Sequence, residues 1–304
     1  MRSAGGTPRG SRRETRAGFL FIAPALLLIG VFFFLPVVAG LVLSLTDFDI
    51  YAIGSTETVR FVGVRNFATL LHDPVFWKAL TNTFYYVVVG APLSVALSLA
   101  AAMLLNAKAV RFRGLFRAVY FAPVVTTLVA VAVVWRYLYH PRIGLFNQAL
   151  GAVGIGPVDW LGDPRWAIPA IIVMTAWKNF GYNMIIFMAG LQSIPESLNE
   201  AAQIDGAGAW QRFRRITLPM LRPTALFVGL TTMIGYFQIF AEPYVMTGGG
   251  GGVLNSALTI VMLMYKEGFR WWNMGFSAAV AFVLFIIVFA ATSVQLLLQR
   301  GRGE

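Results

Sequence analysis

Six long apolar runs, separated by polar segments, dominate the pattern of the sequence. Each run is long enough to cross the hydrocarbon core of a bilayer as a helix, which takes about 20 residues. The runs cover residues 18–45, 80–105, 118–139, 168–191, 225–245 and 275–298. The pattern therefore predicts an all-α, polytopic membrane protein. Its six transmembrane helices occupy residues 18–298, between a tail at 1–17 and a tail at 299–304.

The composition supports this interpretation. Among the 304 residues, 58% are hydrophobic and only 12% are charged, whereas soluble globular domains are about 25% charged. The net charge is +11. In a soluble protein such an excess would suggest a nucleic-acid partner, but a membrane protein carries it on its cytoplasmic loops. We therefore expect contact with a lipid bilayer and not with nucleic acid.

The distribution of Lys and Arg predicts the orientation. Fifteen of them lie in the two tails and in loops 106–117 and 192–224, against seven in the three segments on the other side. The richer side is expected to be cytoplasmic, with both termini inside. The first run follows a basic stretch, as in a signal peptide, but its roughly 27 residues exceed the apolar core of a signal, which has about 7–15. We expect it to be retained as a span.

The outer segments contain structure of their own. Asp73-Pro74 has the form of an N-cap followed by a first-turn proline, and it predicts the start of the helix that becomes the second span. The glycines at 248–252 suit no regular element, and the apolar run 258–265 after them is too short to cross a bilayer. We expect a mobile loop, followed by a helix that lies at the outer surface or dips partly into the membrane.

Loop 192–224 is the most informative segment of the chain. Pro195 and Glu196 can begin a short helix, and Gly206 can end it in a left-handed turn. A second helix would carry Trp210 and Phe213 at a spacing of three residues. Taken alone, this pattern also fits a basic helix pair that rests on lipid headgroups.

The same loop matches a known family pattern. A Glu-Ala-Ala triplet is followed, at the spacing of that pattern, by a glycine, an isoleucine and a Leu-Pro pair. The residues are Glu200, Ala201, Ala202, Gly206, Ile216, Leu218 and Pro219. On this EAA loop, the chain resembles the membrane subunits of bacterial binding-protein-dependent ABC importers. The resemblance extends over roughly residues 19–298.

Other segments resemble one branch of that family. Residues 61–67 (Phe-Val-Gly-Val-Arg-Asn-Phe) and 121–123 (Phe-Ala-Pro) are similar to the carbohydrate-uptake permeases for maltose, other oligosaccharides and glycerol 3-phosphate. Residues 45–48 resemble the first of the two permeases in such systems, in its shorter six-span form. The resemblance implies a sugar, polyol or sugar phosphate as the solute. A permease for a non-sugar solute, or a stand-alone secondary carrier, remains an alternative.

The resemblance also implies a set of partners. The helix pair of the loop would act as coupling helices and dock on a separate ATPase subunit, present in two copies. A second homologous permease would form a heterodimer with this chain, and an external binding protein would deliver the solute. The complex would lie in the bacterial inner membrane, with ATP and Mg bound by the ATPase subunit.

The sequence contains no pattern typical of a catalytic or cofactor site. It has no G-x-x-x-x-G-K-[ST] phosphate loop, so we expect no ATP site, no bound cofactor and no enzymatic activity on this chain. It has no cysteine, and its two histidines, His72 and His140, lie far apart. A metal site is therefore not expected.

Polar residues inside the predicted spans are candidates for the solute pathway. Aromatic faces suit sugar rings, and amides bond hydroxyl groups without adding charge. The candidates are Trp177, Asn179, Tyr182, Asn183, Tyr236 and Gln238. The alternative is that these side chains form hydrogen bonds between helices and stabilise the bundle.

Three charges lie within the predicted spans, where a charge is costly. Glu242 is near the outer end of the fifth run, and Arg136 is near the outer end of the third. Their matching depth predicts an ion pair at the outer mouth, as a gate or a structural clamp. Lys178, about ten residues into the fourth run, is expected to face the central cavity or the second permease.

Overall fold

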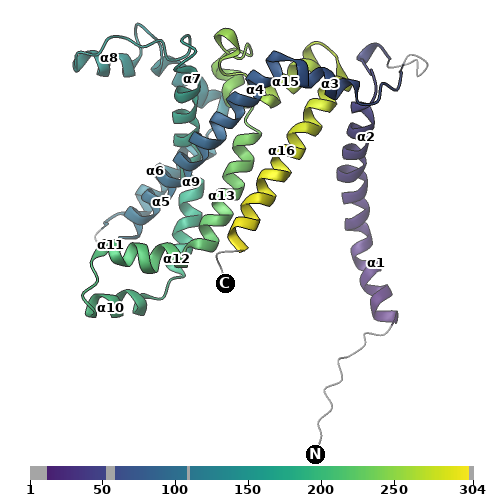
Figure 1. Ribbon diagram of the computed structural model, residues 1–304. Helices are drawn as coiled ribbons and strands as arrows, with labels where there is room; N and C mark the ends of the chain where they lie inside the picture. The colour runs from purple at the N-terminus through teal and green to yellow at the C-terminus, as the bar shows by residue number, and fades with distance from the viewer. Residues whose placement is uncertain (1–11, 53–58, 108–109, 301–304) are drawn as a thin grey trace, which may run out of the picture.

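The computed structural model describes residues 12–52, 59–107 and 110–300. Within these ranges the chain is helical and forms no strand, apart from an isolated bridge between Thr46 and Phe61. The long helices run side by side, and short helices lie at both ends of the bundle (Figure 1). The predicted all-α class is confirmed for this part of the chain.

The elements follow in chain order. In the first half they are α1 (Arg12–Ile29), η1 (Gly30–Phe34), α2 (Leu35–Ser44), η2 (Ile50–Ala52), α3 (Arg65–His72), α4 (Pro74–Tyr85), η4 (Tyr86–Gly90), α5 (Ala91–Asn106), α6 (Arg113–Val125), α7 (Leu128–Leu138) and α8 (Leu145–Ala152). In the second half they are α9 (Ala167–Gln192), α10 (Glu196–Ile204), α11 (Ala209–Arg212), η5 (Phe213–Thr217), α12 (Leu218–Met220), α13 (Arg222–Phe237), α14 (Ala241–Met246), η6 (Val253–Asn255), α15 (Ile260–Tyr265), η7 (Lys266–Arg270) and α16 (Met274–Arg300).

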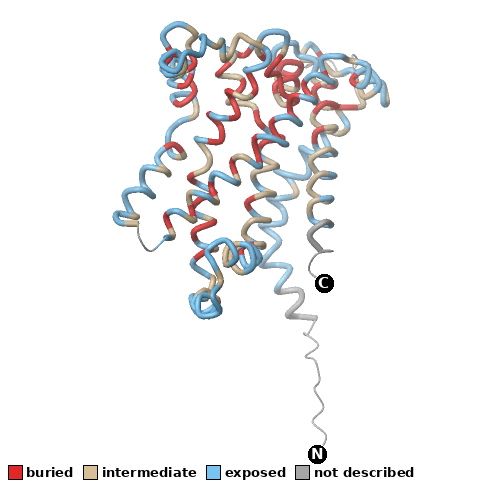
Figure 2. Tube along the Cα trace, turned by 60° about the vertical axis from the view of Figure 1, so that its left-hand side comes forward, coloured by how far each residue is buried: buried red, intermediate tan, exposed pale blue. Residues whose placement is uncertain are grey.

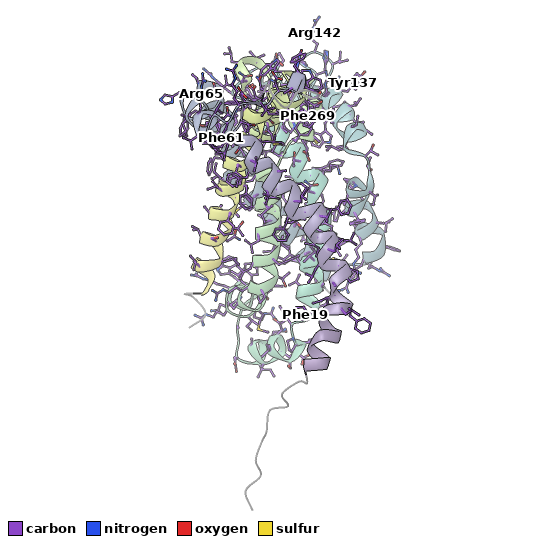
Figure 3. The ribbon with its side chains drawn as sticks, turned by 90° about the vertical axis from the view of Figure 1, so that its right-hand side faces the viewer. Phe19, Phe61, Arg65, Tyr137, Arg142 and Phe269 are labelled. Atoms are coloured by element: carbon purple, nitrogen blue, oxygen red, sulfur yellow. The ribbon has the colours of Figure 1, made fainter. Side chains whose placement is uncertain are left out.

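The first apolar run forms one long helix, from α1 through α2, that stands at the side of the bundle (Figures 1 and 3). None of its most apolar 18-residue window is buried. Most of its length is exposed, whereas buried residues gather in the other long helices (Figure 2). An exposed apolar helix of this length needs lipid or another protein around it.

The far end of this helix is fixed to the bundle by backbone contacts. Asn66, at the start of α3, donates hydrogen bonds from Nδ2 to the carbonyl oxygens of Ser44 (2.9 Å) and Thr46 (2.8 Å). The N–H of Gly275, at the start of α16, bonds the Phe48 carbonyl oxygen (2.9 Å). Asn66 thereby satisfies carbonyl groups that the end of a helix leaves free.

The second span begins as the sequence predicts. The Asp73 carboxylate accepts a hydrogen bond from the Val75 N–H (2.8 Å), so Asp73 is the N-cap of α4, with Pro74 in the first turn. The helix then continues without interruption through η4 to the end of α5. The π turn η4 lies directly before Pro92, which has no N–H to donate to the preceding turn.

The third apolar run is broken, which corrects the expectation of one continuous helix over 118–139. α6 ends at Val125, α7 begins at Leu128, and the two helices meet at 98°. Thr126 and Thr127 have extended backbone conformations between them. Pro123, in the last turn of α6, cannot donate a helical hydrogen bond. The proline and the two β-branched threonines explain why the helix ends here.

The fifth run is broken as well. The helix that begins with α11 bends by 68° into α13, and α13 ends at Phe237. Residues 238–240 are not helical, and α14 then begins at Ala241. The Ile239 carbonyl oxygen in this break accepts a hydrogen bond from the Thr259 hydroxyl (2.9 Å). The predicted span 225–245 is therefore two helices joined by an irregular segment.

The long helix α9 packs closely against α5 and α6. Gly181 faces α6 so closely that a Cβ atom there would overlap the carbonyl oxygen of Tyr120. On α5, Ser94 and Ser98 are fully buried. Small residues let helix backbones approach each other in this way.

The glycine-rich segment lies at the end of the bundle that carries α3 and α15. Hydrogen bonds join it to its surroundings, and the mobility that the sequence suggests stays a prediction. Lys266 Nζ donates to the Gly250 carbonyl oxygen (2.8 Å), and the Gly249 N–H donates to the Tyr244 carbonyl oxygen (2.7 Å). Burial lowers the pKa of Lys266. α15 packs against α4 and α16 at this end of the bundle, with Leu263 buried, and its depth in a membrane stays a prediction.

Length and composition alone identify three helices that can cross a membrane: Gly18–Ser44, Pro74–Asn106 and Met274–Leu297. Counting each bent pair as one span raises the number to five among the described residues. α9 is not among them, because polar residues interrupt its centre, although its 26 residues extend about 39 Å. The count of six spans stays a prediction.

The close contact at Gly181 generates a test of the packing. Gly181→Ala adds a Cβ atom that overlaps the Tyr120 carbonyl group, so α6 must move away from α9. We expect a destabilisation of about 1–3 kcal/mol, the usual cost of overpacking. Gly114, in α6, has no atom within 4 Å of its Cβ position, so Gly114→Ala should not destabilise the chain. Thermal unfolding of both variants in detergent measures the difference, and equal melting temperatures would contradict the packing argument.

Candidate functional site: a central polar pocket and an exposed helical loop

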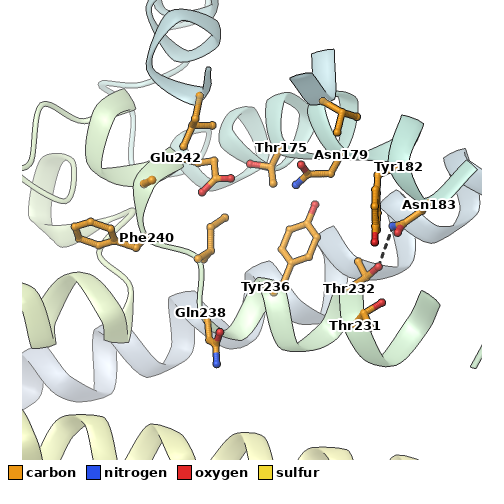
Figure 4. A pocket seen from close by; sticks show the side chains of 15 residues that line it. Thr175, Asn179, Tyr182, Asn183, Thr231, Thr232, Tyr236, Gln238, Phe240 and Glu242 are labelled. Atoms are coloured by element: carbon orange, nitrogen blue, oxygen red, sulfur yellow. Dashed lines mark hydrogen bonds between the residues drawn. The ribbon is translucent and has the colours of Figure 1, made fainter. Parts of the chain in front are cut away.

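A polar pocket of about 560 Å³ lies within the bundle, beside the two broken spans. Side chains from α9, α13 and α14 line it, together with Val124 of α6 and Leu128 of α7 (Figure 4). Its polar lining residues are Thr175, Asn179, Tyr182, Asn183, Thr231, Thr232, Tyr236, Gln238 and Glu242. Five of the six predicted pathway candidates are therefore brought together in one place.

Helix geometry explains the contribution of α9. Asn179, Tyr182 and Asn183 lie four, seven and eight residues after Thr175, a spacing that puts all four on one face of a helix. The sequence analysis missed Thr175, although the same spacing would have found it. Its hydroxyl group is buried and has no hydrogen-bond partner among the described residues.

The break between α13 and α14 brings two further residues to the pocket. Non-helical backbone at 238–240 turns the chain, so that Gln238 and Glu242 both reach the lining. The Glu242 carboxylate is turned towards Thr175 and Asn179, whereas the Gln238 amide points away from them (Figure 4). Irregular backbone at membrane depth is tolerated where it is buried in protein or lines a water-filled cavity. The break is therefore in keeping with a hydrated pocket.

Some of the polar groups hold helices together. Asn183 Nδ2 donates to the Thr232 hydroxyl (2.9 Å), which links α9 to α13, and the Tyr236 and Ser94 hydroxyls are 2.8 Å apart, which links α13 to α5. These bonds match the alternative interpretation of the polar residues. Asn179 and Tyr182 form no side-chain hydrogen bond with the described residues. Their polar groups are therefore available to a ligand.

The predicted ion pair between Arg136 and Glu242 is not formed. Arg136 is exposed and lines a separate pocket with Tyr137 and His140, whereas Glu242 lines the central pocket. Among the described residues Glu242 forms no ion pair with Lys178 either, although the Lys178 charge is near enough to act on it. The prediction estimated the membrane depth of Glu242 by counting residues along an unbroken fifth span, and on that basis paired it with Arg136. The chain in fact changes direction before it reaches Glu242.

Trp177 does not line the central pocket. Its ring lies 5.4 Å from the ring of Trp135 in α7, in a smaller and mostly apolar pocket of about 350 Å³ next to Pro123. Position 177 lies two residues from both Thr175 and Asn179, which puts it on another face of α9. Its position therefore supports packing against α7.

The second candidate site is the loop between α9 and α13, at the end of the bundle where α1 begins and α16 ends (Figure 1). Gly206 follows α10 with a left-handed backbone (φ +78°). The Ala207 N–H bonds the Ala202 carbonyl oxygen at 2.8 Å, and the Gly206 N–H bonds the Gln203 carbonyl oxygen at 3.0 Å. This pair of bonds is the Schellman motif, which favours glycine. The predicted left-handed turn at Gly206 is confirmed.

The loop exposes large apolar side chains. α10 and α11 contain no buried residue. Ile204 is 87% exposed and Trp210 is 68% exposed, and the Trp210 ring lies 5.4 Å from that of Phe213. Of the EAA residues, those exposed are Glu200, Ala201, Gly206, Leu218 and Pro219, and those partly buried are Ala202 and Ile216. Apolar side chains exposed together mark an interaction surface.

The observed charges predict a specific energetic coupling. Lys178→Met and Glu242→Gln should each remove the attraction between two opposite charges that are close but not in direct contact. The double variant should lose less than the sum, with an interaction energy of about 0.5–3 kcal/mol. The matched pair Arg136→Gln and Glu242→Gln should be additive. Unfolding in detergent measures both cycles, and additive losses for Lys178 and Glu242 would refute the assignment.

Comparison with known proteins establishes the relationship of the chain. It is 40% identical to the lactose transport system permease protein LacF of Rhizobium radiobacter, over 94% of each chain. It is 34% identical to the trehalose/maltose transport system permease protein MalF of Thermococcus litoralis, over 96% of each chain.

A chain of a bacterial alginate ABC transporter, solved in complex with its pentasaccharide-bound periplasmic protein, shares the fold. Its TM-score is 0.74 at 21% identity, over 94% of this chain and 96% of that one. Residues 93–303 match the family described as binding-protein-dependent transport system inner membrane component. The chain therefore belongs to the family of inner membrane components of binding-protein-dependent transport systems.

Proposed function

We propose that this chain is the permease subunit of an ATP-driven ABC importer and forms half of the translocation pathway for a sugar. The observation that carries the proposal is the combination, in one chain, of a polar pocket within the bundle and an exposed EAA loop at one end. A pocket alone would also suit a stand-alone carrier. The exposed loop favours a transporter that is driven by a separate subunit.

A sugar or a related polyol is the solute that suits the pocket. Asn179 and Tyr182 present an amide and a hydroxyl with free hydrogen-bonding capacity, and hydroxyl-rich solutes bond both. The Tyr182 ring is 55% exposed, as a stacking face for a sugar ring must be. Relatives are named for lactose, for arabinooligosaccharides and for trehalose and maltose. These observations favour a sugar over an amino acid or an ion.

The EAA loop is proposed as the docking site of the ATPase subunit. Exposed Ile204 and Trp210 give it apolar area to bury, and the Schellman motif at Gly206 fixes the angle between α10 and α11. ATP and Mg would be bound by that subunit, in two copies, and not by this chain. Contact with an ATPase subunit explains the exposed apolar side chains better than contact with lipid headgroups alone does. The rigid turn at Gly206 holds these side chains in a fixed arrangement, which suits a protein partner.

A second, homologous permease is proposed to complete the pathway as a heterodimer. The apolar helix α1–α2 stands at the side of the bundle, and none of its most apolar 18-residue window is buried. A neighbouring permease would cover such a helix. An external binding protein would deliver the solute at the opposite end from the EAA loop.

The proposed topology has six spans, with α9 as the fourth, and a cytoplasmic EAA loop. α1 begins and α16 ends at the same end of the bundle as that loop (Figure 1). Among the described residues, this end also carries most of the Lys and Arg, as cytoplasmic segments do. Both termini would then be cytoplasmic. The tail residues 1–11 and 301–304 lie outside the described residues.

The topology predicts opposite labelling at two exposed positions. The chain has no cysteine, so single introduced cysteines report without background. Val153, after α8, is 72% exposed, and Ile204, at the end of α10, is 87% exposed. In intact cells that lack the ATPase subunit, an impermeant maleimide should label Val153→Cys at once, and Ile204→Cys only after permeabilisation. The opposite labelling pattern would show that the chain has the reverse orientation in the membrane.

A matched pair of glycine variants tests the function and its coupling. Gly206 has φ +78°, whereas Gly208 has φ −67° and no atom within 4 Å of its Cβ position. A left-handed alanine costs about 1–2 kcal/mol, so only Gly206→Ala should distort the loop. In proteoliposomes with the partner permease, ATPase and binding protein, we expect Gly206→Ala to reduce sugar-stimulated ATP hydrolysis and uptake several-fold. Gly208→Ala should resemble the wild type.

The same proteoliposomes separate the proposed importer from a carrier. Uptake of radiolabelled lactose, arabinooligosaccharide, trehalose or maltose should require ATP and the binding protein, and vanadate should stop it. A protonophore should have no effect. Uptake of any of these sugars by this chain alone, driven by a proton gradient, would contradict the proposal.

A further inference from the structure

The central pocket has an unbalanced set of charges. Among the fifteen residues that line it, Glu242 is the one carboxylate, and no Lys, Arg or His is present. The other polar lining groups are the hydroxyls of Thr and Tyr and the amides of Asn and Gln. Any solute in this pocket therefore meets a single acidic group and a set of neutral hydrogen-bonding groups.

The fold places the Glu242 carboxylate so that it points into the central pocket. Glu242 lies in the first turn of α14, directly after the non-helical residues 238–240, and buried Pro243 anchors that turn. In Figure 4 the carboxylate is turned towards Thr175 and Asn179 on the facing wall. Its position therefore depends on the break in the fifth span.

The counter-charge lies outside the lining. Lys178 acts electrostatically on Glu242, yet it does not line the pocket, whereas its neighbour Asn179 does. Successive residues of a helix point about 100° apart, so Lys178 projects from another face of α9 than Asn179. Arg136 belongs to a separate pocket. A solute in the pocket thus reaches the carboxylate without touching a basic group of the described chain.

We infer that Glu242 is a specificity-determining residue, and that it makes this half of the pathway admit neutral, hydroxyl-rich solutes and reject carboxylated, sulfonated or phosphorylated ones. A carboxylate accepts hydrogen bonds from sugar hydroxyls, but it repels an anion across walls of low dielectric, where screening by salt is weak. The inference rests on the proposed function of the pocket as a sugar pathway. Within that function it excludes the sugar phosphates that the family resemblance leaves open.

The test measures the electrostatic potential of the pocket directly. Asn179→Cys places a single thiol opposite Glu242 in the full-length chain, which has no other cysteine. Its reaction rates with neutral, anionic (sulfonate) and cationic (trimethylammonium) methanethiosulfonates of similar size are compared with those of a free thiol. We expect the anionic-to-neutral rate ratio to be lower by roughly tenfold, the effect of one negative charge several ångströms away.

Variants of Glu242 assign that effect. On the Asn179→Cys background, Glu242→Gln should return the ratio to that of the free thiol, and Glu242→Asp should keep it low. Glu267→Gln, which removes an acid outside the pocket, should also leave it low. An unchanged rate with the neutral reagent shows that each variant is folded. A ratio that does not respond to Glu242→Gln, or an anionic rate equal to the neutral one in the parent, would overturn the inference.

Failure of the proposed function has a different signature. The thiol result can be as expected while the wild-type proteoliposomes take up no sugar. In that case the pocket is acidic but is not a sugar pathway, and the solute selectivity is refuted together with the proposed function. If sugar is taken up but the thiol result is not as expected, the selectivity assigned to Glu242 is refuted and the proposed function stands.

Discussion

Inside a membrane, every backbone N–H and carbonyl group needs a partner within the protein or in trapped water. Two breaks, at 126–127 and 238–240, leave non-helical backbone within the long apolar runs, and both adjoin the central pocket. The Thr259 hydroxyl satisfies the Ile239 carbonyl group at the second break. At the first, the Thr126 hydroxyl bonds the Ala122 carbonyl group (2.9 Å). The pocket exists because the chain breaks its helices there and supplies these side-chain partners.

Close packing elsewhere keeps the pocket walls in place. A Cβ atom at Gly181 would overlap the backbone of α6, and one at Gly90 would overlap the ring of Tyr236. Gly90 ends the π turn η4, and the Tyr236 hydroxyl that it accommodates meets Ser94 one turn further along α5. The π turn and the glycine therefore position a pocket residue of another helix. Asn183, Thr232 and Tyr236 thus bond other helices and stabilise the bundle, whereas the polar groups of Asn179 and Tyr182 are left for a solute.

Much of this arrangement follows from the sequence, and the rest depends on contacts that no local pattern encodes. The Asp73 cap and the left-handed Gly206 were predicted because each depends on a few consecutive residues. Hydrophobicity located the third and fifth runs but not their breaks, since Thr126 and residues 238–240 interrupt the helix without interrupting the apolar composition. The prediction of an Arg136–Glu242 pair was wrong for the same reason. Once a helix is broken, the number of residues along a run no longer gives the position of a side chain in the fold. Trp177 was grouped with Asn179 by proximity in sequence, although helical spacing separates them.

The path from the EAA loop to the pocket runs through two helical segments that meet at 68° at Leu221. α12 leads through buried Leu221 into α13, and α13 carries Thr231, Thr232 and Tyr236 to the pocket wall. A Cβ atom at Gly190 in α9 would overlap Thr224, so the start of α13 is packed tightly against α9. A close-packed contact of this kind transmits a displacement and does not absorb it. Residues 238–240 then join α13 to α14, so the loop, the α13 wall of the pocket and Glu242 are connected through consecutive segments of the chain.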